Sequence, residues 1–225
     1  MARIVRKQVL NPSVTLLEVE APLIAKKAQA GQFIILRLDG QGERIPLTIA
    51  DFNREKGTVT IIFQAVGLTT RLLAGLEEGG VIADFVGPLG RPTELPQGAQ
   101  RVCIVGGGVG CAIAYPQAKC CKGEGMAVDV IAGFRSRDIV ILEEEFRAVS
   151  DHLYVMTDDG TWGERGLVTE KLQALIEAGN RYDVVVAIGP IPMMKFVSKT
   201  TEPYGIPTLV SLNPIMIDGT GMCGG

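Results

Sequence analysis

Uninterrupted apolar segments alternate with segments of helical spacing from about Gln100 onward, and this alternation constrains the fold more than any other feature. Strands that are apolar at every position belong to parallel sheets covered by helices on both faces. The sequence therefore predicts a doubly wound α/β domain around a parallel sheet. Its expected strands are "RVCIVGGG", "MAVDVIAG", "HLYVMTDD", "YDVVVAIGP" and "IPTLVSLN", and its expected helices span residues 111–121, 138–149, 166–179 and 191–200.

The sequence before about position 90 follows a different pattern, with short segments rich in β-branched residues between Pro, Gly or Asp-Gly turns. Only residues 68–76 have helical spacing there. Many short strands with turns predict a small antiparallel Greek-key barrel with one helix across its end. The stretch 91–100, with its two prolines, is the expected linker. We therefore expect domains at 1–95 and 96–211, followed by a tail at 212–225.

Charge and apolar content exclude several functional classes. A formal net charge of −3 over 225 residues gives no basic surface for nucleic acid. The N-terminus lacks the apolar core of a signal peptide, and no run of about 18 apolar residues occurs. We expect a cytoplasmic protein with no membrane span. The five cysteines are then reduced, with Cys103 and Cys111 as packing residues. His152, the only histidine, is expected to have a structural role.

The glycine-rich turn "GGGVG" follows the first strand of the expected sheet and opens a helix. Small residues here allow a backbone to approach a pyrophosphate, and free N–H groups point at the anion. The spacing Gly106-x-Gly108-x-x-Cys111 leaves the usual dinucleotide fingerprint incomplete. The turn is either a phosphate site or only a tight connection. Its candidate residues are Gly106, Gly107, Gly108, Val109 and Gly110.

Three other strand ends have a composition that suits the same ligand. Arg135, Ser136 and Arg137 follow the second strand, where they either meet a 2′-phosphate or form a solvated turn. The segment "TDDGTWGERG" contributes Asp158. The segment "IGPIPMM" contributes Gly189, Pro190 and Met193, although such methionines are most often core residues.

In the barrel half, "ERIPLTIAD" (43–51) and "IIFQAVGLTT" (61–70) stand out. The second segment runs through a glycine into Thr69 and Thr70, which we expect to cap the following helix. A capped helix start suits a phosphate, but an ordinary strand-to-helix turn has the same appearance.

Barrel, linker and parallel sheet in this order resemble the ferredoxin–NADP reductase superfamily, whose barrel holds FAD and whose sheet holds a nicotinamide dinucleotide. "IPLT" resembles the family's R-x-Y-S/T flavin motif, except that Arg44 lies one residue further from the hydroxyl residue than the motif's arginine. "GPLG" (87–90) resembles the segment that closes the barrel. The resemblance implies flavin contacts from Arg44, Pro46, Leu47, Thr48, Phe63, Gln64, Ala65, Gly67, Thr69 and Thr70.

"ERIPLTIAD", "TDDGTWGERG" and "SLNPIMIDGTGMCGG" more narrowly resemble the small FAD-bearing subunits of NADH-dependent ferredoxin:NADP⁺ oxidoreductases, a family that includes sulfide dehydrogenase β subunits. The resemblance implies that "DGTGMCGG" begins a [2Fe–2S] loop, with Asp218 and Cys223 as its first two ligands. Plant-type loops run C-x₄-C-x₂-C, so the third ligand would follow Gly225. We therefore expect a chain truncated within this loop, which holds no cluster in its 225-residue form.

The resemblance implies an NAD(P)H-dependent flavoprotein oxidoreductase that passes hydride between NAD(H) or NADP(H) and FAD. Single electrons would pass to a larger iron–sulfur flavoprotein subunit, and indirectly to ferredoxin. No acid, base or nucleophile of the protein is needed for hydride transfer, so no catalytic residue is assigned. The alternatives are the electron-transfer subunit of dihydroorotate dehydrogenase, a self-sufficient flavin reductase, and a non-enzymatic nucleotide-sensing subunit.

Overall fold

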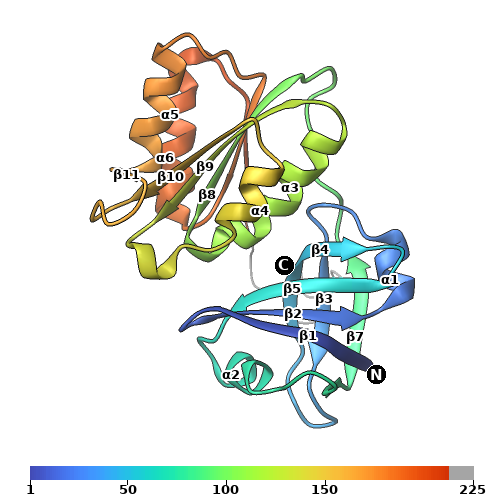
Figure 1. The fold of residues 1–225 in the computed structure, drawn as a ribbon. Coiled ribbons are helices and arrows are strands. Elements are labelled where there is room, and N and C mark those ends of the chain that lie inside the picture. The colour runs from blue at the N-terminus through green and yellow to red at the C-terminus, as the bar shows by residue number, and fades with distance from the viewer. Residues whose placement is uncertain (213–225) are drawn as a thin grey trace. The chain divides into compact units, whose positions relative to one another are not determined.

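The computed structural model describes residues 1–212, which form two compact units, residues 1–93 and 94–212. Within the first unit, antiparallel strands form one curved sheet in the order β6-β1-β2-β5-β4-β3-β7 (Figure 1). Every pairing in it is antiparallel. The strands are β1 (Ala2–Asn11), β2 (Val14–Glu20), β3 (Phe33–Arg37), β4 (Ile45–Asn53), β5 (Thr58–Gln64), β6 (Val81–Ile82) and β7 (Asp84–Leu89).

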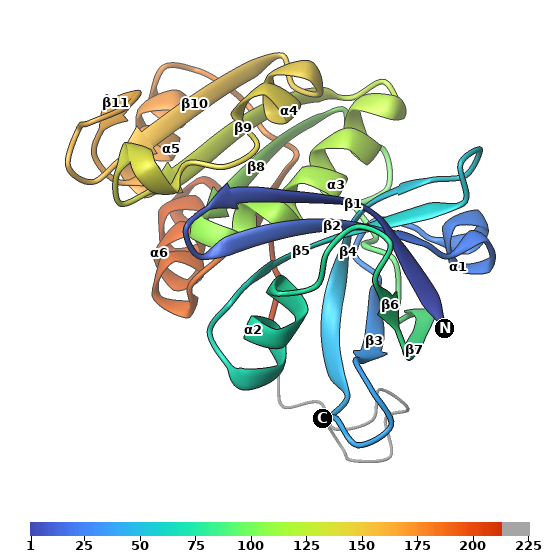
Figure 2. The ribbon, with the colours of Figure 1, turned by 60° about the horizontal axis from the view of Figure 1, so that its bottom comes forward.

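Two short helices accompany this sheet, at opposite ends of β5 (Figure 2). Helix α2 (Leu68–Ala74) follows β5 and occupies the predicted helical segment. Helix α1 (Pro22–Lys27) was not predicted, although proline at its first position is a helix-start signal. It lies beside the turn before β5, where the Ala21 N–H donates to the Gly57 carbonyl at 2.9 Å.

The second unit is a parallel sheet in the order β11-β10-β9-β8-β12-β13, with helices on both faces (Figure 1). Helices α3 and α4 cover one face, and α5 and α6 cover the other. The strands are β8 (Arg101–Gly107), β9 (Ala127–Phe134), β10 (His152–Thr157), β11 (Glu164–Arg165), β12 (Val184–Ile188) and β13 (Thr208–Val210). The helices are α3 (Cys111–Gly123), α4 (Glu143–Ala148), α5 (Val168–Glu177) and α6 (Ile191–Thr201), with 3₁₀ turns η1 (Gly108–Gly110), η2 (Arg137–Ile139) and η3 (Glu202–Tyr204).

One predicted helix is much shorter than expected. Of residues 138–149, only 143–148 are α-helical, because Leu142 has a left-handed backbone with φ of 59°. Ile141 and Leu142 are both buried, so their side chains are anchored in the core just before the helix begins. Tertiary packing here overrides the helical spacing of the apolar residues.

The two units have separate apolar cores, which confirms the predicted fold class of an antiparallel barrel-like sheet plus a doubly wound domain. Ile34, Leu36 and Ile61 lie in the first core, and Val105, Ile131 and Val185 in the second. Cys103 and Cys111 are fully buried, as predicted for packing residues. Among the described residues, no helix is both long and apolar enough to span a bilayer.

Candidate functional site

The glycine turn lies at the carboxyl edge of the parallel sheet, where its strand order reverses. Strands β9 and β10 lie on one side of β8, whereas β12 and β13 lie on the other. Such a reversal opens a crevice that binds ligands in doubly wound sheets. Gly106 and Gly107 end β8, and Gly108 has a left-handed φ of 55° that turns the chain into α3. The turn therefore stands where a dinucleotide's phosphates bind in such folds.

The end of β12 packs directly against this turn. A Cβ atom at Gly110 would lie 2.6 Å from the Ile188 carbonyl oxygen and 2.8 Å from the Gly189 Cα. One at Gly189 would lie 3.1 Å from the Gly107 Cα. Met193, on the first turn of α6, fills the remaining space, because its sulfur is the nearest neighbour of a Cβ at Gly107. The backbones of Gly110 and Gly189, with the Met193 side chain packed beside them, thus form the floor of this crevice.

A second group of predicted residues lies further along the same edge. The Asp158 N–H donates to the Phe134 carbonyl at 3.1 Å, and the Asp159 N–H donates to the Arg135 carbonyl at 3.2 Å. These bonds join the loops that follow β9 and β10. The side chains of Arg135 and Asp158 are exposed. The structure brings these two residues together, but on the β9–β10 side of the edge.

Sequence reasoning did not single out Trp162, which links the same two loops. Its indole N–H donates to Glu143 Oε2 at 2.7 Å, and the Arg137 guanidinium lies 4.4 Å from its ring centroid. Its backbone closes on the buried Thr157, whose hydroxyl donates to the Trp162 carbonyl at 2.6 Å. Trp162 is the only tryptophan of the chain, and this rarity is the one sequence feature that could have drawn attention to it.

In the barrel, the predicted flavin segment lies on β4, paired with β3. Thr48 pairs with Phe33, and Leu47 pairs with Ile34. Pro46, Leu47 and Thr48 are only partly buried, and the Thr48 hydroxyl has no hydrogen-bond partner among residues 1–212. Pro46 and Thr48 share one face of this strand, whereas Leu47, on the other face, packs against the barrel core. The first face thus offers an apolar ring with one available hydroxyl group.

Arg44 precedes this strand and reaches an acidic residue on β7. Its guanidinium lies 3.8 Å from Asp84 Oδ2, which also accepts from Arg37 at 2.7 Å. More than half of the Arg44 side chain stays exposed, at 55%. The Asp84 contact is therefore loose, and Arg44 keeps a free face toward solvent.

The start of α2 is built differently from the expected cap. Gly67 is the N-cap residue, and Thr70 Oγ1 accepts from the Gly67 N–H at 2.9 Å and from the Val66 N–H at 3.1 Å. Thr69 instead donates to Glu43, next to the β4 segment. The two hydroxyl groups thus fix the turn and join it to the other predicted segment.

The residues just before α2 divide into buried and exposed positions. The Phe63 side chain lies in the barrel core, so only its backbone is available to a ligand. The Ala65 N–H donates to the Ser13 carbonyl at 2.8 Å, and Gln64 is exposed.

Asp218 and Cys223, the predicted cluster ligands, lie outside the described residues.

The most strongly bonded carboxylate of the parallel sheet is Asp129, at the opposite edge. It is 2% exposed and accepts from Tyr182 at 2.7 Å, from His152 at 2.8 Å and from Arg101 at 3.0 Å. Burial raises the pKa of this carboxyl group, but the three hydrogen bonds outweigh burial and hold the pKa below its ordinary value. Burial and the adjacent carboxylate raise the pKa of Tyr182.

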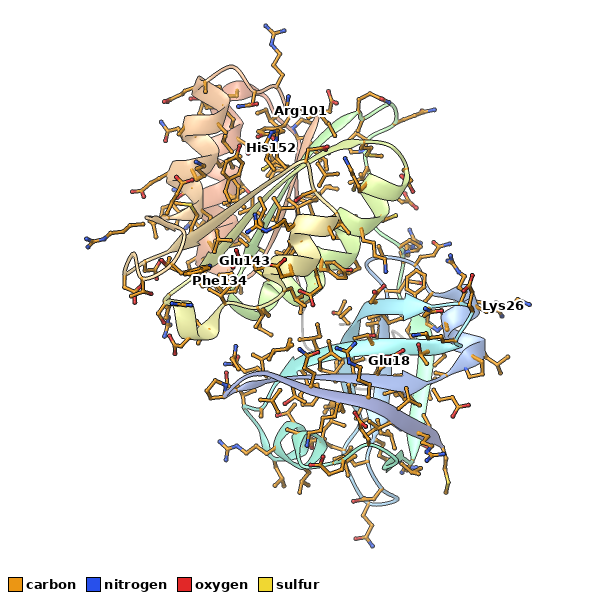
Figure 3. The ribbon with its side chains drawn as sticks, in the orientation of Figure 1. Glu18, Lys26, Arg101, Phe134, Glu143 and His152 are labelled. Carbon is orange, nitrogen blue, oxygen red and sulfur yellow. The ribbon has the colours of Figure 1, made fainter. Side chains whose placement is uncertain are left out.

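This Asp129 cluster is structural and does not belong to the crevice. Arg101 and His152 lie at one end of the sheet, and Phe134 and Glu143 at the other (Figure 3). The prediction of a structural role for His152 is in keeping with its partner, a buried carboxylate. Sequence analysis did not identify Asp129 itself, because it occupies one polar position within an apolar strand.

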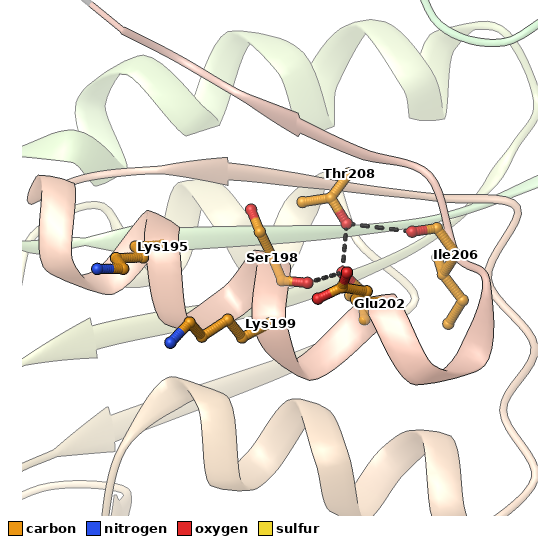
Figure 4. A pocket seen from close by; sticks show the side chains of 7 residues that line it. Lys195, Ser198, Lys199, Glu202, Ile206 and Thr208 are labelled. Carbon is orange, nitrogen blue, oxygen red and sulfur yellow. Dashed lines mark hydrogen bonds between the residues drawn. The ribbon is translucent and has the colours of Figure 1, made fainter.

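A groove beside α6 offers no comparable chemistry. Its lining residues include Lys195, Lys199 and Glu202 (Figure 4). The hydroxyl groups of Thr201 and Thr208 bond to each other at 2.5 Å and to nearby carbonyls. Because α6 runs antiparallel to β12, this groove lies toward the amino edge, away from the glycine turn.

An antiparallel barrel-like sheet followed by a doubly wound parallel sheet is the architecture of the ferredoxin reductase-like class of proteins, and comparison with known proteins agrees. No family model matches the chain. A solved structure of an NADH-dependent reduced ferredoxin-NADP oxidoreductase, described for flavin-based electron bifurcation, is 42% identical with a TM-score of 0.92 and covers 100% of this chain and 80% of that chain. The ferredoxin reductase of carbazole 1,9a-dioxygenase, 18% identical with a TM-score of 0.76, shares the fold over 93% of this chain and 67% of that one.

Curated sequences give the narrower assignment. The dihydroorotate dehydrogenase B (NAD(+)) electron transfer subunit homolog of Thermotoga maritima is 43% identical over 98% of this chain and 77% of that protein. The electron transfer subunit from Bacillus velezensis is 36% identical over 91% and 79%. An uncharacterised protein encoded in the adh 3′ region of Clostridium beijerinckii is 50% identical over 100% and 78%. The chain belongs to the family of ferredoxin reductase-like electron-transfer subunits that contains these proteins, and the predicted resemblance is confirmed.

Proposed function

We propose that this chain carries electrons from a nicotinamide dinucleotide, through FAD, to a partner subunit. The observation that carries the proposal is the glycine turn itself, which packs with Gly110 against the backbone of Gly189 where the sheet order reverses. A turn of glycines at this place lets a pyrophosphate approach backbone N–H groups at the start of a helix. We assign the phosphates of NAD(H) or NADP(H) to Gly106, Gly107, Gly108, Val109 and Gly110, with Gly189, Pro190 and Met193 beside them and Arg135 and Asp158 further along the edge.

The residues of the barrel fit FAD. A Cβ atom at Gly67 would meet nothing nearer than Thr70 Oγ1 at 3.9 Å, so the backbone there is open to a ligand. Val66 and Leu68 beside it expose 66% and 75% of their surface, which is costly for apolar side chains unless something covers them. We assign flavin contacts to Pro46, Leu47 and Thr48, and the remaining contacts to Arg44, Phe63, Gln64, Ala65, Gly67, Thr69 and Thr70.

Bound FAD would supply the ability to take two electrons as hydride and to release them singly. The protein's own residues orient the two nucleotides and exclude water. No titratable side chain of either proposed site is needed to accept or donate a proton during hydride transfer.

The partner is proposed from the relatives. Those from Thermotoga and Bacillus are named electron transfer subunits of dihydroorotate dehydrogenase B, whereas the 42%-identical structure belongs to a ferredoxin-NADP oxidoreductase. We propose a larger iron–sulfur flavoprotein as the partner, with ferredoxin reached through it and a [2Fe–2S] loop begun by Asp218 and Cys223. A dihydroorotate-oxidising partner is the second candidate, and the subunit that co-purifies from the source cells distinguishes the two.

An anaerobic absorption spectrum tests the proposed function. We expect the purified chain, after incubation with FAD, to show a flavin band that bleaches when NADH or NADPH is added. Bleaching requires both nucleotides to bind and hydride to pass between them. A protein that is colourless once unbound FAD has been removed would contradict the proposal and favour a nucleotide-sensing role.

Thr48→Val tests the flavin assignment. The variant removes one hydroxyl donor at nearly constant shape, which is worth about 0.5–1.5 kcal/mol. We therefore expect the dissociation constant of FAD to rise about two- to tenfold, measured by equilibrium titration of the apoprotein. Thr60→Val, on the neighbouring strand β5, is the matched control. Equal FAD affinity in both variants would remove Thr48 from the site.

A further inference from the structure

Three side chains at the carboxyl edge of the parallel sheet form one stacked group, here named the Trp162 clamp: Arg137, Trp162 and Glu143. The Arg137 guanidinium lies 4.4 Å from the Trp162 ring centroid, a cation–π contact. The indole N–H donates to Glu143 Oε2 at 2.7 Å, which fixes the orientation of the ring. The Arg137 N–H donates to Thr161 Oγ1 at 2.9 Å, which fixes the backbone of the arginine as well.

The clamp lies at the strand ends where the ribose that distinguishes the two dinucleotides is expected to bind. In a doubly wound sheet, the residues after the second strand meet the ribose that carries either a 2′-hydroxyl group or a 2′-phosphate. Here that strand is β9, and Arg135 and Arg137 follow it. An arginine at this place is the usual partner of a 2′-phosphate. The guanidinium of Arg137, however, is already stacked on Trp162.

The charges around the clamp also oppose a phosphate. Glu143 is bound to the same indole that holds Arg137, so a fixed carboxylate stands beside the arginine. In the two loops joined by the clamp, acidic side chains outnumber basic ones. They are Asp138, Asp158 and Asp159, against Arg135 and Arg137. Two further carboxylates beside these loops are already paired, Glu143 with Arg147 and Glu164 with Lys171. A 2′-phosphate brought to this edge would therefore meet more negative than positive charge.

We infer that the Trp162 clamp selects NADH over NADPH by withholding Arg137 from the 2′-phosphate. Trp162 acts here as a positioning residue, because it holds Arg137 rather than the nucleotide. The inference rests on the proposed function and adds to it the residue that chooses between the two dinucleotides.

Binding of 5′-AMP and 2′,5′-ADP, measured by calorimetry on the full chain, tests this selection without any turnover. We expect Trp162→Ala to raise the affinity for 2′,5′-ADP relative to 5′-AMP by about fivefold, the effect of releasing one exposed cation–π contact. Trp162→Phe keeps an aromatic face under Arg137, so its ratio should stay near that of the unmodified chain. Arg147→Ala, which removes the other partner of Glu143, is the matched control, with an unchanged ratio.

Two arginine variants make the test specific to Arg137. The double variant Arg137→Ala/Trp162→Ala should lose the whole gain in affinity for 2′,5′-ADP relative to 5′-AMP that Trp162→Ala shows. Arg137→Ala alone should leave the ratio nearly unchanged, because the arginine is already withheld, and this variant does not depend on the folding of a tryptophan variant. An unmoved ratio in Trp162→Ala overturns the inference. A large fall of the ratio in Arg137→Ala overturns it too, since Arg137 would then already serve the phosphate.

Flavin reduction separates this inference from the proposed function. With stopped-flow mixing, Trp162→Ala should lower the apparent Kd for NADPH and change the limiting rate of flavin reduction little, because the clamp acts on binding. If neither dinucleotide reduces the flavin of the unmodified chain, the proposed function fails. If both reduce it and the preference is the same in every variant, only the clamp inference fails.

Discussion

Asp129→Asn is expected to lower the free energy of unfolding of residues 94–212 by about 3 kcal/mol, the lower end of the cost of breaking a buried charged pair. The carboxylate is 2% exposed and accepts from Tyr182, His152 and Arg101. Asparagine has one acceptor oxygen and an NH₂ group that only donates, so all three partners are satisfied only if His152 adopts the tautomer that accepts. The variant also leaves the Arg101 guanidinium without its buried counter-charge. Denaturant unfolding followed by Trp162 fluorescence measures the change, since Trp162 is the only tryptophan and lies in this unit.

The cost of Asp129→Asn should depend on pH in a definite direction. The pKa of Asp129 in the folded chain lies below its ordinary value of 3.8, so the unfolded chain binds the proton more readily. The stabilisation by this carboxylate is therefore complete above about pH 5 and is lost as the pH falls through the folded-state pKa. The difference between the unmodified chain and the variant should narrow below about pH 4.

An exposed carboxylate of the same sheet edge is the control for this prediction. Asp151 is 37% exposed, pairs with Lys122 at 2.5 Å and accepts from the Val128 N–H at 2.7 Å. The asparagine oxygen can keep the Val128 bond, so Asp151→Asn should cost about 1 kcal/mol or less. If the two asparagine variants are equally stable at pH 7, the Asp129 cluster does not hold the edge together. If the stability difference between the unmodified chain and Asp129→Asn stays constant from pH 7 to pH 3, the effect comes from the shape of the side chain and not from its charge.

Local patterns were enough to predict the fold. The continuous apolar runs of β8, β9 and β12 indicate strands buried on both faces, and these strands form the centre of the parallel sheet. The same reasoning failed at residues 138–142, because burial of Ile141 and Leu142 fixes a backbone that their spacing does not describe. It also missed α1, whose six residues carry too few turns for a periodic signal.

The candidate site was only partly readable from the sequence. The glycines at 106–110 and at 189 each follow directly after an apolar strand, so the sequence alone marks both as strand ends without bulky side chains. The contact between Gly110 and Gly189 was not readable, since it depends on β12 pairing with β8. The Trp162 clamp was hidden for the same reason: Arg137 and Trp162 are joined only by the register of β9 and β10.

Gly110→Ala is expected to impair the reaction with NAD(P)H while leaving the flavin in place. The new Cβ would lie 2.6 Å from the Ile188 carbonyl oxygen and 2.8 Å from the Gly189 Cα. Both contacts are with backbone, which cannot rotate away, so the turn and the end of β12 must separate. Overpacking of this kind costs about 1–3 kcal/mol. A shift of the glycine floor by about 1 Å would reduce kcat/KM for NADH about ten- to a hundredfold.

Two comparisons decide whether the loss in Gly110→Ala comes from the crevice. Gly123→Ala, at the end of the same helix α3, adds a methyl group with nothing within 4 Å, so stability should not fall and kcat/KM should stay unchanged. FAD affinity should be equal in both variants, because the proposed flavin residues belong to the other unit. The decisive measurement is the rate of anaerobic flavin bleaching against NADH concentration. If the flavin of Gly110→Ala bleaches as fast as that of Gly123→Ala at every NADH concentration, the pyrophosphate does not bind over this turn. A displaced turn would necessarily slow the reaction of a dinucleotide bound on it.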